Sequence, residues 1–140
     1  MIQLCYASKS SSAPEHLLTD LREILSEAQS FNALNGINGV LFYADQYFFQ
    51  CLEGPRAGVL ALFERIKTDR RHHQVVELGN RDQSNPEFKD WSMKFVRRNS
   101  EVSEFFHAMG HQYFNPVGLG ESHLKDFLKI LTRARQETQA

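Results

Sequence analysis

The apolar positions along the chain follow two spacings, one typical of strands and one typical of helices. Apolar runs of strand length lie at residues 2–7, 40–43, 47–53, 75–81 and 91–96. Apolar residues at helical spacing fill residues 14–30 and 54–69 between them. Asp45 and Gln46 separate the second and third strands as a hairpin turn. The order strand-helix-strand-strand-helix-strand predicts an α+β domain with ferredoxin-like topology, extended by a fifth strand.

The expected sheet has two buried faces. In the third strand, the two-residue period places Gln50 towards the two helices and places Phe49 and Cys51 on the opposite face. That opposite face is too apolar to be left in water. Two further amphipathic helices, in residues 100–110 and 124–131, are expected to cover it.

Side-chain caps predict where two of the helices begin. Ser12 and Glu15 have the spacing of a capping box, and Pro14 suits the first turn of the helix that follows. Ser100 is expected to cap the helix that Gly110 ends.

Length and charge narrow the class of protein. The 140 residues predict one domain, and a net charge of -1 argues against sequence-independent nucleic-acid binding, which usually needs a basic face. The chain has no apolar run of membrane-spanning length and no signal-peptide pattern, so we expect a cytoplasmic location and no membrane partner. Cys5 and Cys51 are expected to be buried free thiols, and no metal site is predicted.

Polar residues in apolar surroundings give the candidate site. Tyr6 and Gln50 lie on strands that this topology makes neighbours, and they form either a satisfied core pair or a hydrogen-bond relay. Asn32 is either a helix-ending residue or an amide that pairs with a ligand edge. Ile24 and Ile66 are either core residues or two walls of a slot for a flat ring.

The charged residues after the second helix are ambiguous in the same way. They form either a solvated helix end or a contact with an anionic or polar ligand tail, and they are Arg65, Asp69, Arg70, Arg71, His72 and His73. Adjacent histidines on a strand face opposite ways, so His72 and His73 are weak as a metal site. Trp91 and Met93 are most simply core residues of the fifth strand. The residues alone therefore predict a polar-lined slot between two helices.

Five segments also match a known pattern in their order and spacing. They are Leu4-Cys5-Tyr6-Ala7-Ser8, Asn32-x-x-Asn35-Gly36-Ile37-x-Gly39, Phe49-Gln50-Cys51-Leu52-Glu53-Gly54, Asp69-x-x-His72-His73 and Trp91-Ser92-Met93. In these segments the chain resembles the BLUF family of blue-light sensors, which bind a flavin, usually FAD. The resemblance implies a flavin-binding photosensor domain in residues 1–97 and a helical cap or output extension in residues 98–140.

The resemblance implies a photoactive relay. Tyr6 matches the tyrosine that gives an electron and a proton to the excited flavin, and Gln50 matches the glutamine that bridges this tyrosine and the flavin. Gln50 is expected to rotate or change tautomer, so that the flavin carbonyl accepts a stronger hydrogen bond and the spectrum shifts reversibly to the red. Trp91 and Met93 match the pair in the fifth strand that exchanges in and out of the pocket.

The resemblance also assigns contacts with the flavin by position. These contacts fall on Tyr6, Ile24, Asn32, Gln50, Arg65, Ile66, Asp69, His72 and His73. Asn32 is expected to pair with the pyrimidine edge of the ring, between walls formed by Ile24 and Ile66. The chain departs from the family pattern at Phe31, where some members have asparagine, and at Asn38, where threonine or serine is common. Neither position belongs to the relay of tyrosine and glutamine.

The implied function is that of a light sensor and not an enzyme. Its signal is expected to leave by light-dependent binding to an unidentified regulatory protein, with a transcriptional regulator or a second copy of the chain as candidates. Two rivals use the same fold. An RNA-binding module displays aromatic residues on an open sheet face, and an acylphosphatase-type hydrolase needs a phosphate-binding arginine where this chain has Lys9. Fold alone does not choose among these three functions.

Overall fold

A computed structural model describes residues 1–135 of the chain. Five strands form one sheet in the order β4-β1-β3-β2-β5. Their bounds are Ile2–Ser10 (β1), Asn38–Ala44 (β2), Tyr47–Gly54 (β3), His72–Asp82 (β4) and Lys94–Arg97 (β5). All neighbouring strands are antiparallel except β2 and β5, which are parallel. The predicted ferredoxin-like order with a fifth strand is therefore confirmed.

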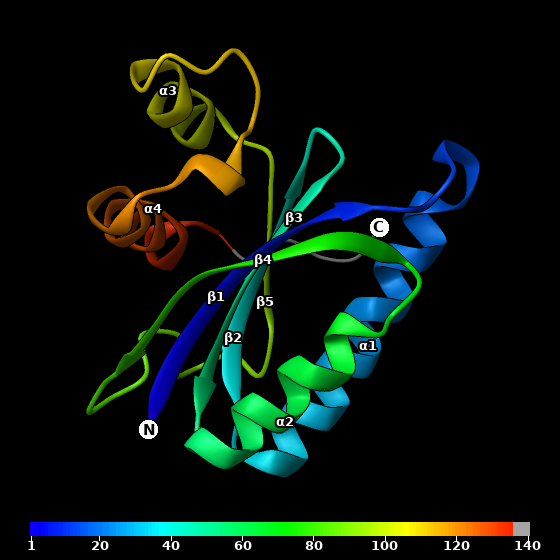
Figure 1. The fold of residues 1–140 in the computed structure, drawn as a ribbon, viewed down its shortest axis with the longest axis vertical. Helices are drawn as coiled ribbons and strands as arrows, with labels where there is room; N and C mark the ends of the chain where they lie inside the picture. The colour runs from blue at the N-terminus through cyan, green and yellow to red at the C-terminus, as the bar shows by residue number, and fades with distance from the viewer. Residues whose placement is uncertain (136–140) are drawn as a thin grey trace.

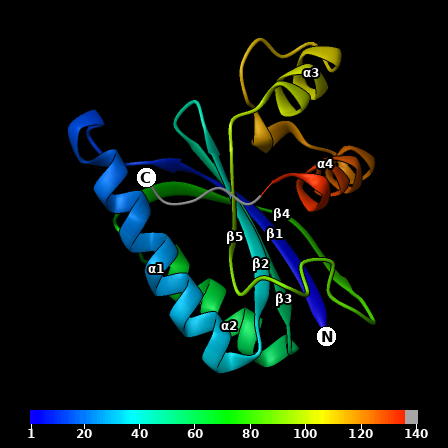
Figure 2. The ribbon, with the colours of Figure 1, turned by 180° about the vertical axis from the view of Figure 1, so that it is seen from behind.

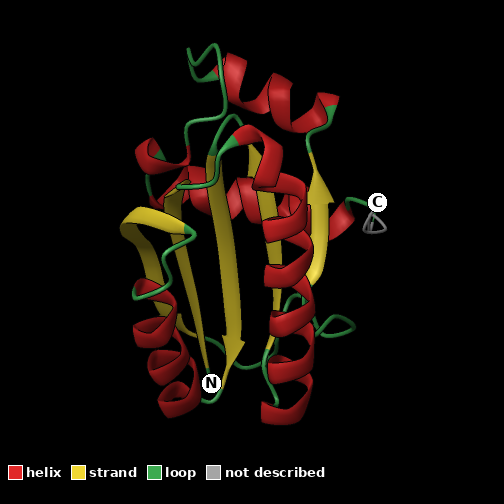
Figure 3. Ribbon diagram, turned by 90° about the vertical axis from the view of Figure 1, so that its right-hand side faces the viewer, coloured by secondary structure: helices red, strands yellow, loops and turns green. Residues whose placement is uncertain are grey.

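Helices cover both faces of this sheet, as Figures 1 and 2 show. The helices are α1 (Leu17–Asn35), α2 (Arg56–Lys67), α3 (Ser100–Ala108) and α4 (Glu121–Arg133), with short 3-10 turns at Pro14–His16 and Pro116–Gly118. α1 and α2 run along one face, which is turned towards the viewer in Figure 3, and α3 and α4 lie on the other. Within residues 1–135, no helix is both long and apolar enough to cross a bilayer.

Two separate cores follow from the alternation of side chains along the strands. The core under α1 and α2 includes Leu4, Leu41 and Leu52. The core under α3 and α4 is rich in phenylalanine, and the ring of Phe127 in α4 lies 4.9 Å from the ring of Phe49 in β3, measured between centroids. Burial of these large rings is the main reason that the C-terminal helices stay on the sheet. The predicted covering of the second face is confirmed.

The first helix differs from its prediction at both ends. It continues beyond residue 30 to Asn35 and ends where Gly36 adopts a left-handed φ of 66°, with its backbone N–H donating to Asn32. Asparagine in a last turn does not end a helix by itself, which is why residue 30 was the wrong end. The capping box is also wrong, because Ser12 donates to the Asp20 carboxylate at 2.5 Å instead of capping the helix.

Three further predicted boundaries differ from those in the structure. β4 begins at His72 and not at residue 75, because His72 and His73 pair with the end of β1. β5 begins only at Lys94, since the chain before it turns, with the Trp91 N–H donating to Phe88. The cap of α3 is Asn99 and not Ser100. A side chain one position earlier reaches the free N–H groups of the first turn.

A buried carboxylate fixes the segment that leads into β5. Glu53, at the end of β3, is fully buried and accepts hydrogen bonds from the side chains of Gln3 and Gln83. It also accepts from the backbone N–H groups of Glu87 and Phe88, at 2.9 and 2.8 Å. Four donors compensate the loss of water around this charge. The loop between β4 and β5 is therefore anchored to the strand that carries Gln50.

Candidate functional site

A cavity of about 340 Å³ lies between α1, α2 and the sheet. Eight of the nine residues predicted to contact a flavin line it, namely Tyr6, Ile24, Asn32, Gln50, Arg65, Ile66, Asp69 and His72. They come from β1, both helices, β3 and the segment that follows α2. The structure thus brings together residues that are far apart in the sequence, and the polar-lined slot predicted between the helices is present.

Tyr6 and Gln50 are directly paired at the floor of this cavity. They are opposite each other in the antiparallel register of β1 and β3, and the Tyr6 hydroxyl donates a hydrogen bond to the side-chain carbonyl of Gln50. Burial raises the pKa of Tyr6 well above its ordinary value, and the negative charge of Asp69 raises it further. Tyr6 therefore keeps its proton, which points at a fixed acceptor.

The other end of the Gln50 amide has only a weak partner. Its nitrogen lies 3.8 Å from the sulfur of Met93, and thioether sulfur is a poor acceptor. Met93 is 1% exposed and Trp91 is 37% exposed, and neither lines the cavity. Of the predicted pair, Met93 is therefore buried next to Gln50, and Trp91 is at the surface.

Asn32 carries an unused acceptor into the buried site. Its side-chain nitrogen donates to the backbone carbonyl of Ser92 at 2.8 Å, which ties the end of α1 to the segment before β5. Its side-chain oxygen is buried and has no hydrogen-bond partner within residues 1–135. Because buried polar atoms are rarely left unpaired, this oxygen indicates a ligand with an N–H donor.

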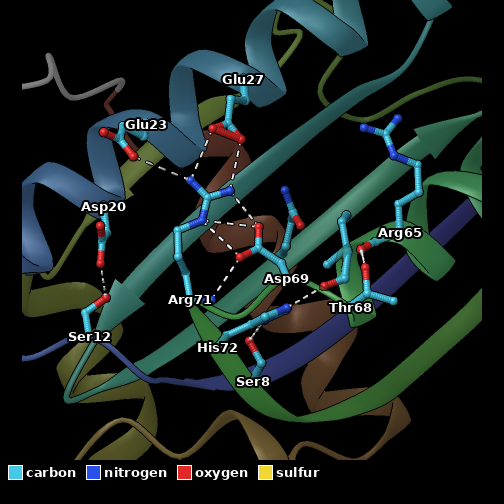
Figure 4. Close-up of polar contacts among 12 residues, drawn as sticks. Ser8, Ser12, Asp20, Glu23, Glu27, Arg65, Thr68, Asp69, Arg71 and His72 are labelled. Carbon is cyan, nitrogen blue, oxygen red and sulfur yellow. Dashed lines mark hydrogen bonds and ion pairs between the residues drawn. The ribbon is translucent and has the colours of Figure 1, made fainter.

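A cluster of charges closes the cavity on the side of α1, as Figure 4 shows. The Arg71 guanidinium contacts Asp69 at 2.6 Å and Glu27 of α1 at 2.9 Å, with Glu23 at 3.9 Å. The hydrogen bond from Arg71 holds the pKa of Asp69 below its ordinary value. Arg71 is therefore already paired with carboxylates and is not a free cation for an anionic ligand tail.

The two adjacent histidines separate, as strand geometry requires. The two ring nitrogens of His72 lie 2.6 Å from the carbonyl of Ile66 and 2.7 Å from the hydroxyl of Ser8. A carbonyl only accepts, so Nε2 of His72 carries a hydrogen. His73 does not line the cavity, and its ring contacts Ser11 at 2.7 Å. His73 lies outside the cavity because it faces away from His72, and its contact with a ligand stays a prediction.

Several cavity residues were not predicted. Phe31 of α1 lines the cavity, and the Arg65 guanidinium lies 4.9 Å from the centre of its ring. Phe48, which also lines the cavity, shares the strand face of Gln50 and could have been found from the two-residue period. Glu27 shares the helix face of Ile24 and could have been found from the helical spacing. The ion pair between Glu27 and Arg71 has no signal in the sequence, since only the fold brings the two together.

The comparison with protein families decides the identity of this cavity. The family of sensors of blue light using FAD, BLUF, matches residues 1–94. The chain belongs to the BLUF family. The predicted family is therefore confirmed, and with it a domain that senses blue light with a flavin. The RNA-binding and hydrolase rivals are not favoured.

Similar proteins agree with this assignment. The structure titled BlsA ground state has 48% sequence identity and a TM-score of 0.95, over 99% of this chain and 91% of that one. The photoactivated adenylate cyclase subunit beta of Euglena gracilis is 34% identical over 92 residues, which is 66% of this chain but 11% of the relative. The blue light- and temperature-regulated antirepressor BluF of Escherichia coli is 36% identical over 58 residues, 41% of this chain and 14% of that protein. The chain thus spans only a small part of these two relatives.

The residues of the cavity fit a flavin, the class of cofactor that BLUF proteins bind. The unpaired oxygen of Asn32 can accept from the ring N–H of a flavin, and the nitrogen of Gln50 can donate to a ring acceptor. Ile24 and Ile66 supply apolar surface on the two helices. Each polar group with a missing or weak partner thus has a matching group on the cofactor.

Proposed function

We propose that this chain is a blue-light photoreceptor that binds FAD non-covalently in the cavity between α1 and α2. Residues 1–97 form the photosensor domain, and residues 98–140 form a helical output extension, of which residues 136–140 lie outside the described part. FAD is proposed in preference to FMN because the family description names it.

The hydrogen bond between Tyr6 and Gln50 at the floor of the cavity carries this proposal. A satisfied core pair would leave no open space beside it and no unpaired acceptor nearby. Here the pair borders a cavity of about 340 Å³, and Asn32, whose buried side-chain oxygen has no partner within residues 1–135, lines the same cavity. The two observations together favour a ligand site over a core pair.

The chemistry of the residues follows from their hydrogen bonds. A bound flavin supplies the absorption of blue light and an acceptor for one electron and one proton. Tyr6 would give up the electron, and its phenolic proton would leave through Gln50, which already accepts from the hydroxyl. Both would return to Tyr6 after Gln50 has rearranged, so that no net reaction occurs. Gln50 then turns its amide or changes tautomer. If the amide oxygen and nitrogen of Gln50 exchange places, little is lost on the side of Met93, because its sulfur is a weak hydrogen-bond partner.

The signal leaves by β5 and the C-terminal helices. Lys94, the first residue of β5, is 4% exposed, and its ammonium donates to the carbonyl of Thr132 in the last turn of α4 at 3.1 Å. It directly follows Met93, which touches Gln50. A movement of Met93 therefore acts on α4 through the next side chain. The output is a light-dependent contact with a regulatory protein of the cytoplasm, with a transcriptional regulator as the candidate.

The absorption spectrum of the purified protein, in darkness and after blue light, tests the proposal. Reconstitution with FAD, and with FMN in parallel, is expected to give a yellow protein whose spectrum shifts slightly to the red and recovers in darkness. A protein that takes up neither flavin would contradict the proposal. Equal uptake of both flavins would remove the preference for FAD while leaving the photoreceptor in place.

A further inference from the structure

A second cavity of about 270 Å³ lies on the opposite side of α1, between this helix and the β5 edge of the sheet. Its apolar lining comes from Leu18, Leu21 and Leu25 of α1, Tyr43 of β2 and Phe95 of β5. We call it the α1–β5 groove. Leu18 is 53% exposed, which is unusual for a leucine beside a concave surface. The groove thus has apolar surface that an additional chain could bury.

The charged residues of the α1–β5 groove are mainly positive. Arg98 is paired with Asp45, which also accepts from the backbone N–H of Phe114. Arg22 and Arg97 are exposed, and neither side chain has an ion pair within residues 1–135. The whole chain has a net charge of -1, so this excess of positive charge is local.

We infer that the α1–β5 groove binds an acidic amphipathic segment of a partner protein. Apolar side chains of the segment pack mainly on Leu18 and Tyr43, above the buried Leu21 and Leu25. Its carboxylates pair with Arg22 and Arg97. An apolar floor with uncompensated cations at its rim is complementary to a helix with one apolar and one acidic face. The inference rests on the proposed function, which requires a protein partner for the signal.

Two other kinds of occupant fit the groove less well. Stable attraction to an anionic bilayer needs a cluster on the order of four to eight cations on a convex or flat surface, whereas this site is concave with two uncompensated arginines. Single-stranded nucleic acid needs aromatic platforms for its bases, whereas the floor here is mainly leucine. Both alternatives become outcomes of the test.

Helix α1 contributes lining residues to both the α1–β5 groove and the cavity between α1 and α2. Leu25 of the groove directly follows Ile24 of the cavity in α1. Phe95 of the groove lies two residues after Met93, whose sulfur touches Gln50. A rearrangement of Gln50 that moves the start of β5 therefore changes the shape of the groove. Binding in the groove is expected to differ between the dark and the illuminated protein.

The test uses the flavin-loaded full chain and fluorescein-labelled peptides of about 15 residues, near the length at which isolated helices become marginally stable. A panel carries leucines at helical spacing in several registers with glutamates elsewhere, and a matched panel carries lysines in place of the glutamates. Fluorescence anisotropy is expected to report saturable binding of glutamate peptides alone, with different affinities in darkness and light. The double variant Arg22→Glu/Arg97→Glu is expected to weaken this binding by about tenfold or more.

The control is Arg56→Glu/Lys129→Glu, which changes the net charge equally but lies on α2 and on the exposed side of α4. Equal weakening in both double variants would overturn the inference, because it would reflect overall charge. No saturable binding in a sample that still shifts to the red would overturn the groove and leave the photoreceptor standing. Arginine-dependent binding without any red shift would support the groove and contradict the proposed function. Retention on anionic vesicles or single-stranded RNA, in place of the peptides, would also overturn it.

Discussion

The side-chain nitrogen of Gln50 lies 3.8 Å from the sulfur of Met93. The carbonyl oxygen of the same amide accepts from the Tyr6 hydroxyl. One side chain therefore connects β1, β3 and the residue immediately before β5. Because its two ends have unequal partners, a change in the proton or electron content of Tyr6 alters which orientation of the amide is preferred. Met93, which contacts the amide nitrogen, would be displaced first by that change.

Tyr6→Phe is expected to keep flavin binding and to abolish the red-shifted state. Phenylalanine retains the ring that packs 5.3 Å from Phe63, measured between centroids, but has no proton to give and is much harder to oxidise. The measurement is the difference spectrum after blue light, with flavin content from the ratio of visible to ultraviolet absorbance. Tyr113→Phe is the control, since Tyr113 is exposed far from the cavity. A normal red shift in Tyr6→Phe would rule out the proposed donor.

Gln50→Leu is expected to keep flavin binding and to lose the normal red shift. Leucine fills a similar volume but removes the acceptor for Tyr6 and the donor that faces Met93. The buried Tyr6 hydroxyl is then unpaired, which costs about 1–3 kcal/mol of stability. Difference spectra and urea unfolding measure the two effects. Gln112→Leu, at an exposed loop position, is expected to match the parent in both.

The part of the site set by strand period was predictable, and the part set by loops was not. The two-residue alternation along β3 placed Gln50 towards the helices, and the topology placed Tyr6 beside it. Trp91 and Met93 were expected in a strand, but they precede β5, and a turn puts one outside and the other inside. Side-chain direction in an irregular segment depends on its tertiary anchors, here the four hydrogen bonds to Glu53.

Helix ends and ion pairs were the least predictable features of the fold. α1 ends at a glycine with positive φ, and the sequence has two Asn-Gly steps, Asn35-Gly36 and Asn38-Gly39, either of which could end the helix. Gly39 instead belongs to β2, where a Cβ atom would lie 2.2 Å from the Cys51 carbonyl, so the need there is for space. The contact between Arg71 and Glu27 joins residues 44 apart in sequence, and no local pattern encodes it.

Glu53→Gln is expected to lower the free energy of unfolding by about 1–3 kcal/mol. Oε2 of Glu53 accepts three hydrogen bonds and Oε1 accepts one. The glutamine amide has only one oxygen that accepts hydrogen bonds. Its nitrogen would therefore face at least one of the buried N–H donors, which would lose its acceptor. Urea unfolding of the parent and the variant measures the loss. Glu64→Gln removes an exposed pair with Lys67 and should change stability by less than about 0.5 kcal/mol; equal losses in both would contradict the anchoring role.

The Asp69 carboxylate should make stability depend on pH at the acidic end. Its pKa is lowered in the folded state by Arg71, whereas an unfolded aspartate titrates at about 3.9. The unfolded chain therefore binds more protons, and the contribution of this group is complete above about pH 5 and falls as the pH drops through the folded pKa. Urea unfolding from about pH 3 to 7 measures it. The difference in stability between the parent and Asp69→Asn should be constant near neutrality and shrink on acidification.

A stability difference that grew on acidification would contradict this sign. Asp20→Asn is the matched control, because Asp20 pairs with the Ser12 hydroxyl and not with a cation. A change of the same size in Asp20→Asn over this pH interval would show that the effect does not depend on the ion pair between Asp69 and Arg71.

Lys94→Met is expected to leave the red shift intact and to prevent the light-induced change from reaching α4. The methionine keeps an unbranched apolar stem in the same buried place but cannot donate to the Thr132 carbonyl. The charge near the C-terminal end of α4, where the helix dipole favours a cation, is lost as well. Hydrogen exchange of the amides in α4 is measured in darkness and in light. In darkness it should be faster in the variant than in the parent, and in the variant it should no longer change with light.

Lys129→Met removes an exposed lysine from the same helix and should retain the light-induced difference. If Lys94→Met also retained it, the signal would reach α4 by packing across the phenylalanine-rich core, in which Phe127 contacts Phe42 of β2 and Phe49 of β3.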